Sequence, residues 1–283
     1  MRRALVFLLL VLPASACGGD VASIDPVAQA AATSTKAHTM NVDVTTKMTA
    51  PGMTTPFAMN TAGEVDSVAR RIRMSLDLSS LAALMPAGRN QPADFRGEEV
   101  GDFSNGRAVM YMSLPFMTKL LPQQKPWIKI DLQAAAKTAG LDISQLTQVS
   151  SDPAQSLDYL RATSGDIKEL GSETIDGVKT THYRATIDFD KYPKLVPPER
   201  RAAVRRAIAA LRRLTHVRLQ PVDVWVDDDK LVRKLHEAFA ETVRGQQLTL
   251  DLTMKFHHFN APVSITIPAA ADTADISQLT GGG

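Results

Sequence analysis

The sequence has a single cysteine, Cys17, among its 283 residues. A disulfide within the chain is therefore excluded, and the folded protein must be stabilised by its core. Aromatic residues make up only 5% of the chain, whereas hydrophobic residues make up 44%. That core must therefore consist mainly of aliphatic and methionine side chains. The longest apolar run, residues 4–12, is far shorter than the roughly 20 residues that a membrane-spanning helix needs.

Sequence signatures of catalysis and of metal binding are also missing. There is no G-x-S-x-G turn, no phosphate-binding glycine loop and no H-E-x-x-H motif. His257 and His258 are adjacent in a predicted strand, so they point to opposite faces and cannot share a metal. Asp227-Asp228-Asp229 fits a hairpin turn better than a calcium loop. We expect no enzymatic activity, metal or cofactor, and the net charge of +2 gives no reason to expect a nucleic-acid partner.

The N-terminus has the layout of a secretory signal. A basic pair at positions 2 and 3 precedes the apolar run, and small residues lie directly before Cys17. Small residues before a cysteine are typical of lipoprotein processing, although Ala14 stands where leucine is usual. Ala14-Ser15-Ala16 also fits an ordinary A-x-A cleavage site, which would leave Cys17 unmodified. We expect a diacylglycerol anchor on Cys17, because two acyl chains suffice for stable membrane attachment.

These features divide the chain into three predicted segments. Residues 1–16 are a signal peptide, and residues 17–37 are the lipidated cysteine with a flexible tether rich in Ala, Ser, Thr and Gly. Residues 38–283 form the folded body. The predicted location is the outer face of the cytoplasmic membrane.

The body is predicted to consist mostly of β-strands, because apolar and polar residues alternate with a period of two. Asn105-Gly106 and Asp176-Gly177 are signals for tight hairpins. The predicted strands are 40–48, 57–66, 70–78, 98–103, 107–112, 127–131, 167–175, 178–188, 217–226, 231–239, 247–259 and 263–267, and the predicted helices are 132–139, 143–149, 154–162 and 198–214. Successive hairpins indicate a meandering antiparallel sheet of about ten strands, which tends to curl. The expected class is therefore α+β, with one large curved sheet.

Three phrases resemble a known family in the same order along the chain. They are GSETIDGVKTTHYRATIDFDKY (Gly171 to Tyr192), PVDVWVDDDKLVRKLHEAF (Pro221 to Phe239) and LTLDLTMKFHHFNAPVSITIP (Leu248 to Pro268). The chain resembles the actinobacterial lipoproteins of the LppX/LprG type, relatives of the LolA/LolB carriers. The resemblance implies a U-shaped half-barrel with helices on its concave side and an apolar cavity that carries a lipid or glycolipid. It transfers no binding motif, and fold alone does not establish function.

Strand periodicity then suggests which side chains line such a cavity. The candidates share one predicted face and are Met40, Val42, Val44, Ile72, Met74, Leu76, Leu250, Leu252 and Met254. The methionines suit either an adaptable lining for acyl chains or ordinary core packing. The connections 78–92 and 113–126 are unusually apolar and are predicted either to form lips at the cavity mouth or to plug the sheet.

The predicted helix 198–214 is amphipathic. Its basic face carries Arg201, Arg205 and Arg212, which are candidates for contact with lipid headgroups; a solvated face of a helix that covers the core is the alternative. The expected function is lipid carriage in the cell envelope, with a membrane-tethered sensor or scaffold that holds no lipid as the alternative. The sequence does not identify a transporter partner.

Overall fold

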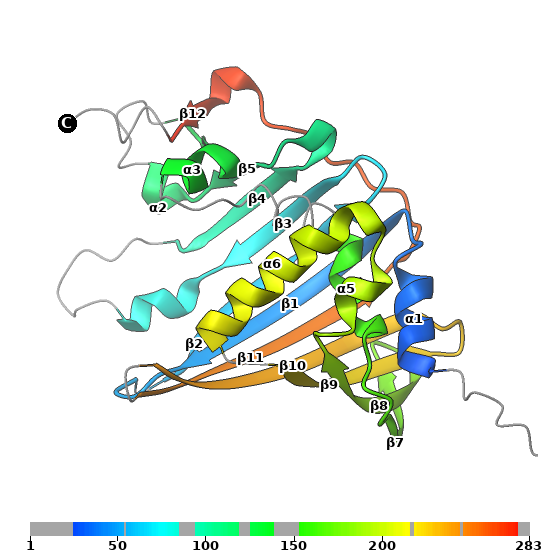
Figure 1. The fold of residues 1–283 in the computed structure, drawn as a ribbon. Helices are drawn as coiled ribbons and strands as arrows, with labels where there is room; N and C mark the ends of the chain where they lie inside the picture. Colours follow the sequence, from blue (N-terminus) through cyan, green and yellow to red (C-terminus); the bar gives the residue numbers. More distant parts are fainter. Residues whose placement is uncertain are drawn as a thin grey trace, which may run out of the picture.

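The computed structural model describes residues 25–53, 55–84, 94–118, 125–138, 153–215, 218–243 and 246–276. Its strands form one twelve-stranded sheet in the order β12-β6-β5-β4-β3-β2-β1-β11-β10-β9-β8-β7 (Figure 1). The strands are β1 Thr39–Thr49, β2 Phe57–Asp66, β3 Arg71–Asp77, β4 Arg96–Asp102, β5 Val109–Ser113, β6 Trp127–Asp131, β7 Lys168–Ile175, β8 Val178–Asp188, β9 Leu219–Asp227, β10 Val232–Val243, β11 Gln246–His257 and β12 Thr273–Asp275.

The sheet consists of two antiparallel meanders that join in the middle. Strands β1 to β6 follow one another across one half, and β7 to β11 across the other. The halves meet where β1 pairs with β11, with Asn41 opposite His257. The short strand β12 pairs with β6 in parallel, unlike the other strand pairs of the described chain. The curved, open sheet of the predicted α+β class is thereby confirmed.

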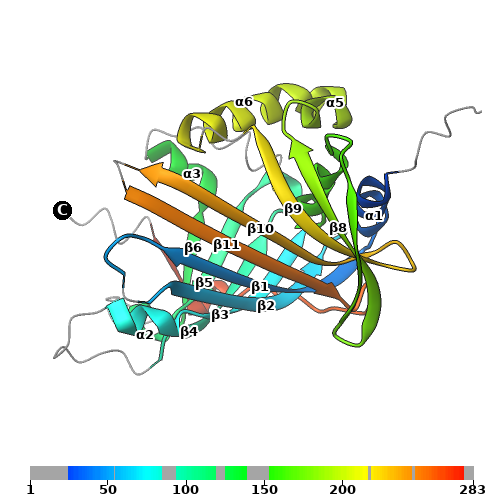
Figure 2. The same ribbon diagram turned by 90° about the horizontal axis from the view of Figure 1, so that it is seen from below.

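Helices cover one side of this sheet. They are α1 Pro26–Ser34, the 3₁₀ helix η3 Pro153–Arg161, α5 Tyr192–Leu195 and α6 Pro198–Thr215. Figure 1 shows α1, α5 and α6 in front of the sheet, and Figure 2 shows the sheet curving toward the side where α5 and α6 lie. This side is the concave face. The other helical elements of the described residues are η1 Ser79–Leu84, η2 Ser104–Gly106, α2 Pro115–Thr118, α3 Leu132–Thr138 and η4 Ala270–Asp272.

The helix α1 corrects the predicted tether. Asp25 caps its N-terminus by accepting a hydrogen bond from the Ala28 amide at 2.8 Å, and Pro26 suits the first turn. Val27, Ala30 and Ala31 are fully buried in the core. The prediction of a flexible tether is therefore wrong for residues 26–34, because small apolar residues at helical spacing pack here as tightly as larger ones. Residues 1–24, with the predicted signal peptide and Cys17, lie outside the described residues.

Most predicted strands are confirmed within a few residues, but two predictions near turns are wrong. The segment 263–267 is not a strand, because both edges of β11 are already occupied by β1 and β10. Instead the chain after β11 crosses the convex face, fixed by a hydrogen bond from the Thr39 hydroxyl to the Ala261 carbonyl at 2.6 Å (Figure 2). The connection around Asn105-Gly106 is six residues long rather than a two-residue turn, since Asp102 pairs with Val109. The predicted helix 143–149 lies outside the described residues.

The turn at Asp176-Gly177 follows the prediction. Ile175 pairs with Val178, so only two residues connect β7 and β8. Both have positive φ, 49° for Asp176 and 84° for Gly177. A two-residue turn of this kind needs positive φ at both positions, which aspartate tolerates and glycine adopts freely.

Candidate functional site: the apolar concave face

The strand registers bring all of the predicted lining residues onto one face. Val44 lies opposite Met254 on β11 and opposite Thr61 on β2, which in turn lies opposite Leu76 on β3. Residues directly opposite one another in antiparallel strands point to the same side. The same registers add Met48, Phe57, Met59, Met110, Met112, Ile128, Ile130, Leu235 and Phe239 to this face.

This apolar face is the concave one that the helices cover. Met40, Val42 and Met74 belong to one core cluster together with residues of α1, η3, α5 and α6. The helix contribution includes Val27, Ala30, Leu157, Leu160, Tyr192 and Val204. The sheet thus presents its apolar side to the helices, as the amphipathic pattern requires.

Burial is uneven along the central strands. On β1, Met40 is 1% exposed and Val42 is 6% exposed, whereas Val44 and Met48 are only half-buried. On β11, Phe256 is 3% exposed, whereas Met254, Leu252 and Leu250 are half-buried. The helices therefore close one end of the concave face and leave apolar side chains partly accessible toward the other end.

The acidic residues Glu237 and Glu99 fall within this apolar face, and neither was among the predicted site residues. Glu237 on β10 lies opposite Leu252 and is only 6% exposed. Its carboxylate accepts a hydrogen bond from the Tyr159 hydroxyl of η3. Burial raises the pKa of Glu237 above its ordinary value, and burial followed by the nearby carboxylate raises the pKa of Tyr159.

The second acid is Glu99 on β4, which lies opposite Met74 on one side and Met112 on the other. Burial raises the pKa of this carboxyl as well. The sequence contained a signal for both acids. Glu237 alternates with Leu235 and Phe239, and Glu99 falls on the apolar face as soon as the pairing of β4 with β3 is known.

The arginines of α6 hold different positions. Arg201 donates to the Val196 carbonyl at 3.2 Å, and Arg212 donates to Asp190 at 2.8 Å. Arg205 is exposed. The adjacent residues Ala203 and Val204 are buried, as the predicted amphipathic character requires. Two of the three candidate headgroup contacts therefore already hold the helix in place.

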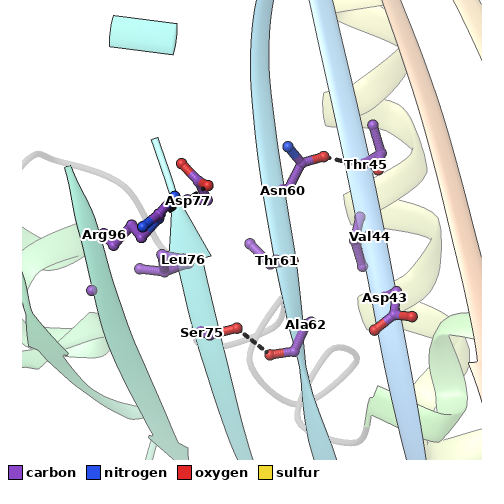
Figure 3. Close-up of a pocket in the computed structure, with 11 residues that line it drawn as sticks. Asp43, Val44, Thr45, Asn60, Thr61, Ala62, Ser75, Leu76, Asp77 and Arg96 are labelled. Atoms are coloured by element: carbon purple, nitrogen blue, oxygen red, sulfur yellow. Dashed lines mark hydrogen bonds and ion pairs between the residues drawn. The ribbon is translucent and has the colours of Figure 1, made fainter. Parts of the chain in front are cut away.

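The convex face is polar and carries a shallow pocket of about 360 Å³ (Figure 3). Asp43, Asn60, Ser75 and Asp77 lie along it, with Arg96 at one side. Val44, Thr61 and Leu76, which the registers place on the concave side of the same strands, also line it. Arg96 pairs with Asp77 at 3.4 Å, and the Ser75 hydroxyl donates to the Ala62 carbonyl at 2.9 Å. Because charged and polar side chains such as Asp43, Asp77 and Arg96 line it, this pocket is less suited to an apolar ligand than the concave face.

The predicted lips are described only in part. The connection after β3 begins with η1, where the Ser80 hydroxyl donates to the Ala58 carbonyl. The connection after β5 begins with α2, where Phe116 contacts Phe95 with ring centroids 5.3 Å apart. Residues 85–92 and 119–124 of these connections lie outside the described ones. Both predicted segments therefore start as short helical turns.

The described residues contain neither a membrane-spanning helix nor a cluster of metal ligands. None of the helices in those residues is long and apolar enough to cross a membrane. Within the same residues, no group of three or more His, Cys, Asp or Glu side chains is arranged to hold a metal ion.

Comparison with known proteins places the chain near bacterial lipoproteins. No protein-family model matches it. It is 32% identical over 163 residues to an uncharacterized 31.2 kDa protein of Streptomyces griseus, covering 55% of this chain and 50% of that protein. It is 28% identical over 157 residues to a Streptomyces coelicolor protein named "putative lipoprotein", covering 54% of this chain and 43% of that protein. The chain thus spans about half the length of the curated relatives it matches.

Solved structures give the same kind of neighbour. The fold is similar to LprF from Mycobacterium bovis, with a TM-score of 0.48 and 13% identity over 87% of this chain and 96% of that one. It is also similar to the Mycobacterium tuberculosis lipoprotein LppX, with a TM-score of 0.41 and 13% identity over 86% of this chain and 100% of that one. LppX belongs to the group of lipoproteins that the sequence phrases resemble.

Proposed function

We propose that this protein is a lipid-binding lipoprotein of the cell envelope, which holds the acyl chains of a lipid or glycolipid against its concave face. The observation that carries the proposal is the uneven burial of that face. Leu250, Leu252 and Met254 point to the covered side of the sheet, yet all three are only half-buried. Apolar side chains left partly exposed in a concave surface favour an apolar ligand.

The proposed action is physical and needs no bond-making step. Acyl chains leave the membrane and cover the half-buried end of the concave face, while the headgroup stays at the open side. Each methylene removed from water contributes about 0.8 kcal/mol, so two long chains supply ample driving force. Release then requires an acceptor of similar apolarity, such as a second membrane or a protein partner.

The proposal includes the membrane anchor. Residues 1–16 act as a signal peptide, Cys17 carries a diacylglycerol group, and the folded body sits at the outer face of the cytoplasmic membrane. Since α1 begins at Pro26, the tether is confined to the residues between Cys17 and Asp25. Since a stretch of eight residues can span at most about 28 Å, an anchor at Cys17 limits how far the folded body can lie from the bilayer.

Neighbouring residues of β11 provide a matched test. Leu250 lies on the concave face and Thr249 on the convex face, where it is exposed. Three proteins would be purified from an actinobacterial host. They are the full chain with Cys17→Ser, which serves as the unchanged version, and the same chain with either Leu250→Asp or Thr249→Asp added. Mass spectrometry would identify bound lipids, and displacement of a fluorescent long-chain fatty acid would measure affinity.

We expect lipid in the unchanged and Thr249→Asp proteins, and a loss of at least tenfold in probe affinity for Leu250→Asp. Thermal unfolding of each variant separates loss of binding from loss of folding. If no lipid is recovered and the probe does not bind, the carrier proposal is wrong. A membrane-tethered sensor or scaffold would then be the better description.

A further inference from the structure

A second pocket lies at the opposite end of the sheet from β7, on the convex face. It has a volume of about 480 Å³, within the range of ordinary small-ligand sites. Its floor is formed by Tyr111 on β5 and Lys129 on β6, which lie opposite one another. Arg107, Lys125 and the C-terminal segment from Pro268 to Asp275 form the remaining walls. Segments far apart in the sequence thus enclose one hollow.

The pocket is on the other side of the sheet from the apolar site. Tyr111 alternates along β5 with Met110 and Met112, which point to the concave face. Lys129 alternates in the same way with Ile128 and Ile130 on β6. A ligand in this pocket is therefore separated from the proposed acyl-chain site by the thickness of the sheet. The two sites can be tested independently.

The charges in the pocket are unbalanced. Arg107, Lys125 and Lys129 line it together with a single carboxylate, Asp275. Lys129 lies 3.2 Å from Asp275, and Lys125 donates to the Thr273 carbonyl at 3.1 Å. The ion pair is about one-third exposed on both sides, at 37% and 31%, so it is weak in water.

Arg107 is held at the rim in the same loose way. Its guanidinium lies 3.6 Å from Asp102, a distance beyond that of a good hydrogen bond, and its side chain is 63% exposed. A guanidinium and two ammonium groups around one hollow favour an anion with several oxygen atoms. The tyrosine hydroxyl at the floor can donate a further hydrogen bond.

We propose that this pocket binds a phosphate group, carried either by a phospholipid headgroup or by a small soluble phosphate ester. Lys125 and Lys129 are the central ligands, with Arg107 closing over the phosphate from the rim. A phosphate with a short polyol such as glycerol fits a hollow of this volume.

The test uses the full chain carrying Cys17→Ser, so that an acyl anchor does not mask binding. Glycerol 3-phosphate would be titrated by calorimetry at physiological salt, into this protein and into its Lys125→Gln and Lys129→Gln variants. Lys125→Gln is conservative, because a glutamine amide can still donate toward the Thr273 carbonyl. Lys47→Gln is the control, since Lys47 is exposed on the convex side of β1, away from the pocket. A second arm measures co-sedimentation with phosphatidylcholine vesicles that contain phosphatidylglycerol.

We expect each pocket variant to weaken binding at least about tenfold, because hydrogen bonds to charged groups are the strong ones. Lys47→Gln should leave binding unchanged. Binding of glycerol 3-phosphate with this pattern supports a soluble ester. If the protein binds the vesicles but not glycerol 3-phosphate, and the pocket variants weaken vesicle binding while Lys47→Gln does not, the result supports a phospholipid headgroup. Absence of binding in both arms, or equal losses for Lys47→Gln, overturns the proposal and leaves the fatty-acid probe result unaffected.

Discussion

The hydrogen bond between Tyr159 and Glu237 gives a sharp test of how the concave face is held together. Tyr159→Phe removes only the hydroxyl that donates to the buried carboxylate. When a buried charged group loses a hydrogen-bond donor, the free energy of unfolding falls by about 2–3 kcal/mol. We therefore expect the free energy of unfolding in urea at pH 7 to fall by that amount, with the slope of the unfolding curve unchanged.

The size of this effect should depend on pH. Burial raises the pKa of Glu237, so lowering the pH protonates the folded carboxyl before the unfolded one. At low pH the hydrogen bond that Tyr159→Phe removes is one between two neutral groups, and such a bond contributes about 1 kcal/mol. Tyr159→Phe should therefore cost less near pH 4.5 than at pH 7.

Two further variants complete this experiment. Tyr183→Phe is the matched control, because Tyr183 packs on the same core and no hydrogen bond of its hydroxyl is found among the described residues. It should cost less than about 0.5 kcal/mol. Tyr159→Phe combined with Glu237→Leu should be less destabilising than Tyr159→Phe alone, since it leaves no unpaired carboxylate. Equal costs for Tyr159→Phe and Tyr183→Phe at both pH values would refute the reasoning.

Three other changes have defined outcomes. The Glu237 carboxyl binds its proton more tightly in the folded protein than in the unfolded chain, so the free energy of unfolding rises as pH falls through the raised pKa toward 4.5. Glu237→Gln should flatten this pH dependence, which urea titrations between pH 4 and 7 would measure. Asp25→Ala removes the cap of α1 and should lower the free energy of unfolding by about 1 kcal/mol, measured by the same titration at pH 7. Arg212→Gln breaks an exposed ion pair with Asp190 and should cost less than about 1 kcal/mol, whereas a drop in fatty-acid affinity greater than twofold would assign Arg212 a direct ligand contact.

Much of the sheet was predictable because polar and apolar residues alternate along its strands, which gives each strand one solvent-facing side and one buried side. The candidate lining residues could be placed on one face for the same reason, since Met40, Val42 and Val44 alternate with polar neighbours. Whether they line a space or fill a core depends on how far the helices extend over them. That is a property of tertiary packing, and periodicity contains no information about it.

The unpredicted features depend on contacts between distant segments. The helix α1 has a composition typical of a linker, and it becomes visible only because Ala30 and Ala31 fit closely against η3 and the sheet. The acids Glu99 and Glu237 oppose the hydrophobic pattern of their strands, as residues with a role in binding or specificity often do. The phosphate pocket combines Lys129 with Asp275, which are 146 residues apart, so no local motif marks it.

The pairing of β1 with β11 has a consequence for how the molecule must be made. Both strands are long and central, yet Asn41 and His257 are separated by almost the whole described chain. During synthesis, β1 remains an unpaired edge strand until β11 has been made, and an unpaired edge strand can pair with strands of other molecules. Contacts so remote in sequence also slow folding. A fragment that ends before Gln246 should therefore aggregate rather than persist as a half-sized domain.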